Sequence, residues 1–339
     1  MNRRLNEVPI KSEYIPGAVN AINNCLRVQP HERVTLITDE ITLDIAASLL
    51  DQIQRTGAPC TTFVLEEVCR RPVREAPAVI LAELAQSDVA LMCAKSQTGE
   101  IPSRMQIIDA VERQGVRYAH MVGIDGDIMV QSMRADFEEV NALGERLEKM
   151  LSAARAVRVT TALGTDFEAT LHPKWRWRNT SGKITPEMWS NLPAGEIFTC
   201  PQSADGIFVV DGSIGDFLCW KYGCVGDTPL RLEIVDGRLR YAESDNPELV
   251  EDFWKYCRTA ENSDRVGEFA IGTNISVKRC IGNLLQDEKM PGAHIAFGNP
   301  AGNQTGADWA CPSHIDVIAT GCNIWIDQQK VMEKGRFLI

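Results

Sequence analysis

Two histidines near the C-terminus are the residues best suited to chemistry in this sequence. The chain has five histidines, and His294 and His314 flank a loop-like stretch rich in Gly, Asn and Pro. His314 begins an apolar run, HIDVIA, that has the composition of a strand. Because residues two apart in a strand point to the same face, His314 and Asp316 can direct an imidazole and a carboxylate toward one point. That pairing is suited to binding a metal ion.

Two glutamates stand in apolar surroundings. Glu196 precedes an Ile-Phe pair in NLPAGEIFTCP, and Glu268 lies within RVGEFAIGTN. Buried carboxylates are usually paired with a cation or bound to a metal. Each glutamate could instead face solvent from its strand, and the local pattern does not decide between these two alternatives.

Composition limits the partners of the chain. Its 339 residues carry a net charge of -11 with 44% hydrophobic content. Partners rich in phosphate require concentrated positive charge, so we expect no nucleic-acid or membrane partner and favour a small molecule or peptide. No stretch approaches the roughly 20 apolar residues of a membrane span, and the eleven cysteines are scattered without a secretion signal. We therefore expect a soluble, cytoplasmic protein with reduced thiols.

The first part of the chain has the alternation of an α/β fold. Helix-sized segments separate apolar runs at 33–38, 60–66, 88–94 and 117–123. Gly57 and Gly115 end two of these helical segments, and Ser103 with Gln106 has capping-box spacing. The pattern predicts a doubly wound α/β domain with a mainly parallel sheet over residues 1–152. Neither GxGxxG nor GxxxxGK[ST] occurs there, so we predict no nucleotide cofactor.

The second part of the chain is dominated by strands and tight turns. An amphipathic segment at 136–154 predicts a connecting helix. Beyond it, Asp236-Gly237 between two alternating runs predicts a hairpin, and Asn246-Pro247 predicts a helix start. We therefore expect an α+β, mainly antiparallel, metal-binding domain over residues 153–339.

Several separated motifs of this second domain resemble one known family. NLPAGEIFTCP, GEFAIGTNISVKRCIGNLLQDEKMPGAHIAFG and SHIDVIATGCNIWIDQQKVMEKGRFLI occur in the order found in the thermophilic aminopeptidase T and aminopeptidase S family of metallopeptidases. The resemblance covers most of residues 155–339. It implies a homodimeric, metal-dependent aminopeptidase with an antiparallel C-terminal domain.

The resemblance also implies a site for two divalent metal ions with five protein ligands, Glu196, Glu268, His294, His314 and Asp316. Three carboxylates and two neutral imidazoles against two divalent ions leave about +1, which a bridging hydroxide would neutralise. Mixed nitrogen and oxygen ligands suit zinc, cobalt or manganese. Glu196 or Glu268 would relay a proton to the leaving amine, and the sequence does not choose between them. It assigns no substrate-binding residue.

One position departs from the pattern of the family. The peptidases carry a tyrosine a few residues after the HLALG-type motif, whereas no tyrosine lies between His294 and His314 here. A donor that stabilises the oxyanion in this way can be worth ~10²-fold or more in rate. Asn299, Asn303 or Gln304 could take that role, or they could serve the backbone of the turn.

A second resemblance supplies an alternative function. The segments MWSNLPAGEIFTCP and CPSHIDVIATGCNIWIDQQ are similar to 2,5-dihydroxypyridine dioxygenases, which implies one Fe(II) held by two histidines and an aspartate. His314 and Asp316 match two of those ligands, but the other histidine falls at Glu268. His294 could supply the third arm. A ring-cleaving Fe(II) dioxygenase is therefore the alternative to the metallohydrolase, and a binding protein without turnover is a third hypothesis.

Overall fold

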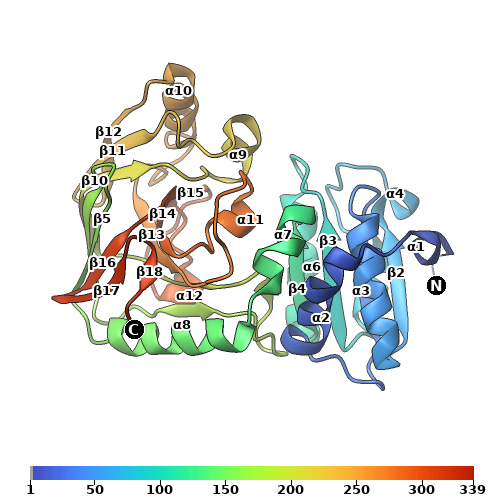
Figure 1. The fold of residues 1–339 in the computed structure, drawn as a ribbon. Coiled ribbons are helices and arrows are strands. Elements are labelled where there is room, and N and C mark those ends of the chain that lie inside the picture. Colours follow the sequence, from blue (N-terminus) through green and yellow to red (C-terminus); the bar gives the residue numbers. More distant parts are fainter. Residues whose placement is uncertain (1–2) are drawn as a thin grey trace. The chain divides into compact units, whose positions relative to one another are not determined.

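The computed structural model describes residues 3–339, which divide into two compact units (Figure 1). The first unit comprises the chain up to Phe137 and Gly182–Ala194, and the second comprises Glu138–Ser181 and Gly195–Ile339. This division differs in two respects from the expected boundary between residues 152 and 153. The helix before that boundary packs its leucines into the core of the second unit. A later segment returns to the first unit, where its short strand joins the sheet.

The first unit is built on a five-stranded parallel sheet, as the alternation of strands and helices predicts. The strand order is β2-β1-β3-β4-β8, with bounds β1 Val34–Thr38, β2 Cys60–Val64, β3 Val89–Ala94, β4 Arg117–Val122 and β8 Ser190–Asn191. The helices are α1 Arg3–Glu7, α2 Ile15–Val19, α3 Leu43–Thr56, α4 Leu65–Val68, α5 Ala78–Leu84, α6 Ile101–Gln114 and α7 Gly126–Val130. Short η elements lie at Ser12–Tyr14, Asn20–Cys25 and Ser132–Arg134. Ile37 and Met92 of the sheet share an apolar cluster with residues of α5 and α6.

The ends of helices α3 and α6 confirm the predicted glycine stops but not the predicted capping box. Gly57 and Gly115 follow α3 and α6 in the left-handed conformation, at φ 84° and 67°, as predicted. The predicted capping box at Ser103 is wrong, because α6 begins at Ile101 with a proline in its first turn. The Ser103 hydroxyl is buried and donates to the carbonyl oxygen of Val73 at 2.7 Å.

Buried ion pairs fill the carboxyl ends of the central strands β1 and β3. Asp39 follows β1, and its carboxylate accepts hydrogen bonds from Arg71 Nη1 at 2.5 Å and from the N–H of Lys95 at 2.6 Å. Arg71 also pairs with Glu100 at 2.7 Å. Ligands of doubly wound sheets bind outside this edge of the strands. In this unit the Arg71 guanidinium and the carboxylates of Asp39 and Glu100 lie at that edge of the sheet.

The second unit contains two antiparallel sheets, as predicted, with strand orders β12-β11-β10-β6-β5-β16-β17-β18 and β15-β14-β13-β9-β7. We call these sheet B and sheet C. Sheet B comprises β5 Ala156–Thr160, β6 Asp166–Thr170, β10 Ser203–Val210, β11 Leu230–Val235, β12 Arg238–Glu243, β16 Asn323–Ile326, β17 Gln329–Glu333 and β18 Arg336–Phe337. Sheet C comprises β7 Arg178–Thr180, β9 Glu196–Thr199, β13 Val266–Gly272, β14 Gly292–Gly298 and β15 His314–Ala319.

Five helices accompany these sheets. They are α8 Phe137–Leu151, α9 Asp216–Tyr222, α10 Pro247–Tyr256, α11 Leu284–Asp287 and α12 Gly302–Thr305. The predicted start of α10 is confirmed, since the Asn246 side chain accepts the N–H of Leu249. The predicted hairpin between β11 and β12 is also confirmed, with positive φ at Asp236 and Gly237.

Sheet C has two different faces. Along β14, Ile295 and Phe297 point into the main apolar core of the unit, which sheet B and α8 also line. His294 and Ala296 alternate with them and take the opposite face. Asp316 of β15 pairs with Ala296, whose small side chain leaves room beside the carboxylate. One face of the sheet is therefore apolar packing, and the other carries candidate ligands.

A β-bulge at Gly267 turns Glu268 onto the ligand face. The register of β13 against β14 shifts between Val266 and Glu268. One extra residue reverses the alternation of side chains, so that Val266 stays in the apolar core while Glu268 points to the other side. A Cβ on Gly267 would lie only 2.1 Å from the carbonyl oxygen of Gly298, so the bulge requires glycine.

Across residues 3–339, no helix is long and apolar enough to cross a membrane. The longest helical segments fall short on length alone, since α8 has 15 residues and a span needs roughly 20.

Replacing Gly267 with alanine should distort the bulge, because the added Cβ would overlap the carbonyl of Gly298. We expect a loss of about 1–3 kcal/mol in the free energy of unfolding, measured by urea denaturation. Gly226→Ala is the matched control, since its Cβ would meet the Asp211 carbonyl at an ordinary 3.4 Å. Equal stability of the two variants would show that the bulge tolerates a side chain.

Candidate metal centre

Sheet C brings the five predicted ligand residues together on one face. Ligand atoms of Glu196, Glu268 and His294 lie within 4.8 Å of one another, and so do those of Glu268, His314 and Asp316. Glu268 belongs to both groups. The residues come from four strands, β9, β13, β14 and β15, which are neighbours in the sheet in the same order as in the sequence. The arrangement offers three carboxylates and two imidazoles on one face of sheet C.

His294 faces two carboxylates without a hydrogen bond to either. Its Nε2 lies 3.4 Å from Glu196 Oε2 and 3.5 Å from Glu268 Oε1. This nitrogen is buried and has no hydrogen-bond partner among the described residues. Two ligand atoms that each lie about 2.1 Å from a tetrahedral cation are about 3.4 Å apart. The spacing therefore fits ligands around a cation better than a direct hydrogen bond.

His314 and Asp316 form the outer group with Glu268. His314 Nε2 lies 3.3 Å from Asp316 Oδ1, and the other ring nitrogen, Nδ1, lies 3.2 Å from the carbonyl oxygen of Asn299. A carbonyl that accepts from one ring nitrogen orients the other toward a metal. The His314 side chain is 37% exposed whereas that of Asp316 is buried, so solvent reaches the site from the His314 side.

The buried carboxylates shift the pKa of both histidines. Burial opposes a charge on His294, but its contacts with Glu196 and Glu268 outweigh burial and raise the pKa to about 10. Burial also opposes a charge on His314, whose pKa is raised to about 10 chiefly by Asp316. Without a metal ion, each imidazole therefore holds a proton at neutral pH, and it must lose that proton to become a ligand.

Sequence reasoning missed Lys289, which contacts this site. Its Nζ lies 2.6 Å from Glu196 Oε1 and 2.5 Å from Glu288 Oε1, and its side chain is 1% exposed. The Thr180 hydroxyl also donates to Glu196 Oε1, at 3.2 Å. The charged stretch QDEKMPG has the composition of an exposed turn, and Glu196 lies 93 residues earlier. No local pattern could have indicated the contact.

The polar residues that follow β14 serve their own loop. The Asn299 side chain accepts the N–H of Ala301 at 2.9 Å, which is the turn role considered for it. Backbone carbonyls of Asn303 and Gln304 accept hydrogen bonds from the Arg176 guanidinium. These contacts hold the loop that carries the carbonyl facing His314.

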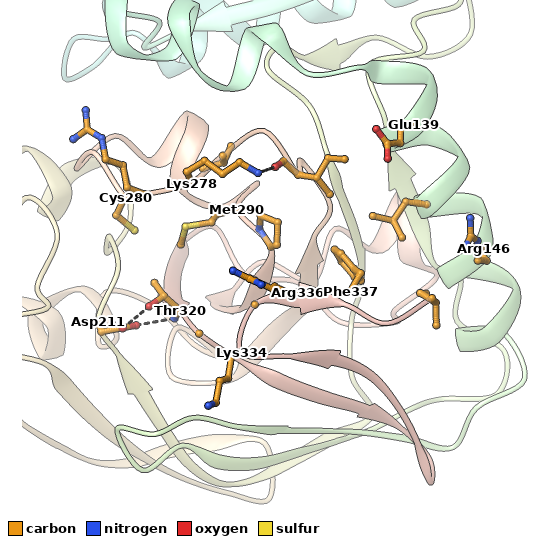
Figure 2. Close-up of a pocket in the computed structure, with 18 of the residues that line it drawn as sticks. Glu139, Arg146, Asp211, Lys278, Cys280, Met290, Thr320, Lys334, Arg336 and Phe337 are labelled. Atoms are coloured by element: carbon orange, nitrogen blue, oxygen red, sulfur yellow. Dashed lines mark hydrogen bonds between the residues drawn. The ribbon is translucent and has the colours of Figure 1, made fainter.

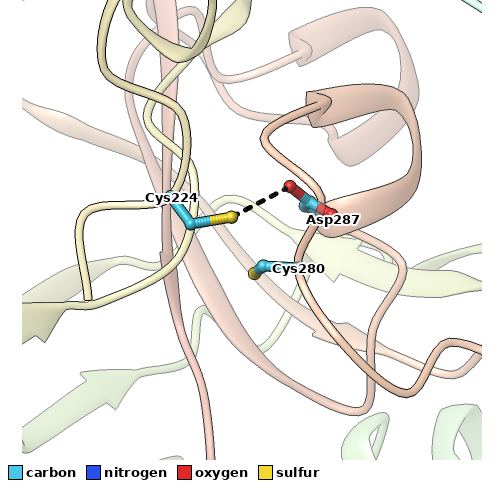
Figure 3. Close-up of side chains that lie close together, drawn as sticks. All are labelled: Cys224, Cys280 and Asp287. Carbon is cyan, nitrogen blue, oxygen red and sulfur yellow. Dashed lines mark hydrogen bonds between the residues drawn. The ribbon is translucent and has the colours of Figure 1, made fainter. Parts of the chain in front are cut away.

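A second group of possible ligands, Cys224, Cys280 and Asp287, lies outside the five-residue site (Figure 3). The Asp287 carboxylate accepts three consecutive backbone N–H groups beginning at Ile281, and the Ser213 hydroxyl. Cys224 Sγ lies 4.0 Å from the same carboxylate. A hydrogen bond with Cys280 lowers the pKa of the Cys224 thiol. The contacts of Asp287 are those of a residue that secures a loop.

A cavity of about 930 Å³ in the second unit is lined by more basic than acidic side chains (Figure 2). Arg146, Lys278 and Arg336 are among its lining residues, together with Asp211, which accepts hydrogen bonds from the backbone and hydroxyl of Thr320. None of the five candidate ligands lines this cavity. It is therefore separate from the candidate metal centre.

Comparison with known proteins identifies relatives of two kinds. Residues 109–323 match the family described as thermophilic metalloprotease (M29). The 2,5-dihydroxypyridine 5,6-dioxygenase of Pseudomonas putida (strain KT2440) is 25% identical over 198 residues, which cover 56% of this chain and 55% of that protein. The chain thus spans about half the length of that curated relative.

Two solved structures share the fold. The 2,5-dihydroxypyridine dioxygenase from Pseudomonas putida KT2440 matches with a TM-score of 0.70 at 18% identity, over 97% of this chain and 98% of that chain. Wild-type AmpT from Thermus thermophilus matches with a TM-score of 0.69 at 16% identity, over 96% of this chain and 99% of that chain. At these identities the likeness establishes the fold alone.

Metal binding should release protons, because His294 and His314 are protonated in the metal-free protein. Titration calorimetry with Mn²⁺ at pH 7, in buffers of different ionisation enthalpy, should report about one to two protons released per chain. Because both pKa values lie near 10, the apparent affinity should rise as the pH is raised from 6 to 9. A binding enthalpy that is independent of the buffer would contradict the protonated state.

Proposed function

The chain belongs to the thermophilic metalloprotease (M29) family, and we propose that it is an aminopeptidase-type hydrolase that cleaves a peptide or amide bond of a small substrate. The observation that carries the proposal is the pair of overlapping ligand groups that share Glu268 on one face of sheet C. Membership of the family supports a metal-dependent hydrolase, and the buried carboxylates and imidazoles supply suitable ligands.

The residues present fit a divalent cation. The buried Nε2 of His294 has no hydrogen-bond partner among the described residues. It lies 3.4 Å from Glu196 Oε2 and 3.5 Å from Glu268 Oε1, which is the spacing expected between two ligands of one cation. Mixed oxygen and nitrogen ligands favour zinc, cobalt or manganese, and the family resemblance implies two ions per chain. A bound divalent cation would polarise the scissile carbonyl and lower the pKa of the attacking water.

The protein's own residues divide the remaining work. Glu268 belongs to both ligand groups, so we assign its oxygens to holding the cation. One oxygen of Glu196 accepts from Lys289 and Thr180, so we assign the other, Oε2, which lies 3.4 Å from His294 Nε2, to carrying a proton from water to the leaving amine. His314 is the ligand with an exposed side chain, so we expect substrate to approach past its ring.

A ring-cleaving dioxygenase is the alternative function, and the sequence match to 2,5-dihydroxypyridine 5,6-dioxygenase favours it. That function needs His294 to join His314 and Asp316 as the third ligand of an iron facial triad. The third member of that group is instead Glu268, while His294 groups with Glu196. The donor set of one histidine and two carboxylates fits the hydrolase better.

We also propose that the protein is a cytoplasmic homodimer that acts on a small molecule or peptide. The family resemblance implies the homodimer, and the composition of the chain favours a cytoplasmic location and a small-molecule or peptide substrate. The net charge of -11 argues against nucleic acid and anionic membranes as partners.

Removal of metal with a chelator should abolish hydrolysis of amino-acid anilides, and zinc, cobalt or manganese should restore it, because the cation activates the water. The same protein should be assayed on hydroxypyridines while oxygen consumption is followed. Recovery with Fe(II) alone, accompanied by oxygen uptake, would support the dioxygenase instead. Absence of both bound metal and turnover would support a binding protein.

Glu268→Gln should lower metal affinity and turnover together, because it removes the charged ligand that both groups share. We expect the affinity to fall by about 10–100-fold or more, measured by metal analysis of the purified variant. Glu233→Gln is the matched control, since Glu233 is an exposed glutamate on β11 of the same unit. If Glu268→Gln kept its metal and lost only turnover, Glu268 would be the proton carrier and not a ligand.

A further inference from the structure

Lys289 places a cationic side chain against the group that contains Glu196 and His294, and we propose that this ammonium takes the place of a second metal ion. The inference rests on the proposed metal-dependent function. It assigns one tightly bound divalent cation to each chain, held by the group of Glu268, His314 and Asp316. The family resemblance implies two.

The fold holds the backbone of Lys289 beside Glu196. Glu196 pairs with Gly272 across β9 and β13. The segment that follows α11 crosses against the same glycine, since a Cβ on Gly272 would lie 1.9 Å from the carbonyl oxygen of Met290. The N–H of Asn274 donates to the carbonyl oxygen of Lys289 at 3.0 Å. Lys289 therefore reaches Glu196 from a backbone position that sheet C itself determines.

The ammonium of Lys289 is enclosed and paired. Its side chain is 1% exposed, and Nζ contacts Glu196 Oε1 at 2.6 Å and Glu288 Oε1 at 2.5 Å. Burial opposes the charge, but these two carboxylates outweigh it and raise the pKa of Lys289. A protonated lysine has no lone pair for a metal. It can therefore neutralise Glu196 but cannot add a ligand.

A second ion would also lie close to the ammonium. Lys289 Nζ is 2.6 Å from Glu196 Oε1, so an ion bound by the same carboxylate would stand about 4–5 Å from Nζ. Like charges at that separation in a buried site repel strongly, and we expect the second ion to bind roughly a hundredfold more weakly than the first. Without that ion, Glu196 is not a ligand, which is consistent with its assignment to proton transfer.

The test is the metal stoichiometry of the full chain loaded with Mn²⁺, which has little affinity for the thiolates of the cysteines. The wild-type protein should bind one tight ion and show the electron paramagnetic resonance spectrum of an isolated manganese centre. Lys289→Met removes the charge at similar length, and this variant should bind two ions with a spin-coupled spectrum. Lys330→Met, which breaks an exposed pair with Glu333, is the control and should bind one.

The outcomes separate this inference from the proposed function. Two tight, coupled ions in the wild-type protein would overturn the inference, and so would a single ion in Lys289→Met. No tight ion in the wild-type protein, with Mn²⁺, Zn²⁺ or Co²⁺, would overturn the proposed function itself.

A second variant keeps the test decisive if Lys289→Met does not fold. Glu196→Gln should retain one Mn²⁺ with an affinity within about threefold of wild type, because Glu196 is not a ligand of the remaining ion. A large loss of affinity in Glu196→Gln would place Glu196 in the ligand set and contradict the inference.

Discussion

Three carboxylates buried on one face of a single sheet must be offset by positive charge. Glu196, Glu268 and Asp316 are each at most 8% exposed, and ionised carboxylates in such positions are costly unless they are paired or bound to a cation. Some of the compensation is built into the chain as the ammonium of Lys289. The imidazoles of His294 and His314 bind protons when no metal is present. A divalent cation supplies what these groups leave unbalanced.

This concentration of charge depends on the other face of sheet C. Phe269, Ile295 and Val317 pack with sheet B and α8 in one apolar core, so the strands are held without help from the ligands. The ligand face then needs small residues to make room, and Ala270 and Ala296 provide them opposite His294 and Asp316. A rigid apolar support with a polar opposite face positions several ligands at once. The parallel unit contributes none of the five candidate ligands.

Predictions that depend on neighbouring residues were correct, whereas those that depend on contacts between distant segments were not. The parallel strands and the Asp236-Gly237 hairpin were predicted correctly, because apolar runs and turn residues act within a few positions. The capping box at Ser103 failed because a proline started the helix earlier, and the hydroxyl bonded to a residue 30 positions away. The boundary at residue 152 could not anticipate that residues 182–194 return to the first unit, since strand pairing across that distance leaves no local signal.

By itself, the sequence determined which residues could act as ligands and that these residues lie in β-strands. His314 and Asp316 share a face because side chains in a β-strand alternate with a period of two residues, and this rule needs only the sequence. Only the tertiary structure decided that Glu268 joins both ligand groups and that Lys289 rests on Glu196. Those arrangements depend on a bulge at Gly267 and on a chain crossing at Gly272. Both arise where segments distant in sequence approach too closely for any side chain, and such contacts are set by packing rather than by local pattern.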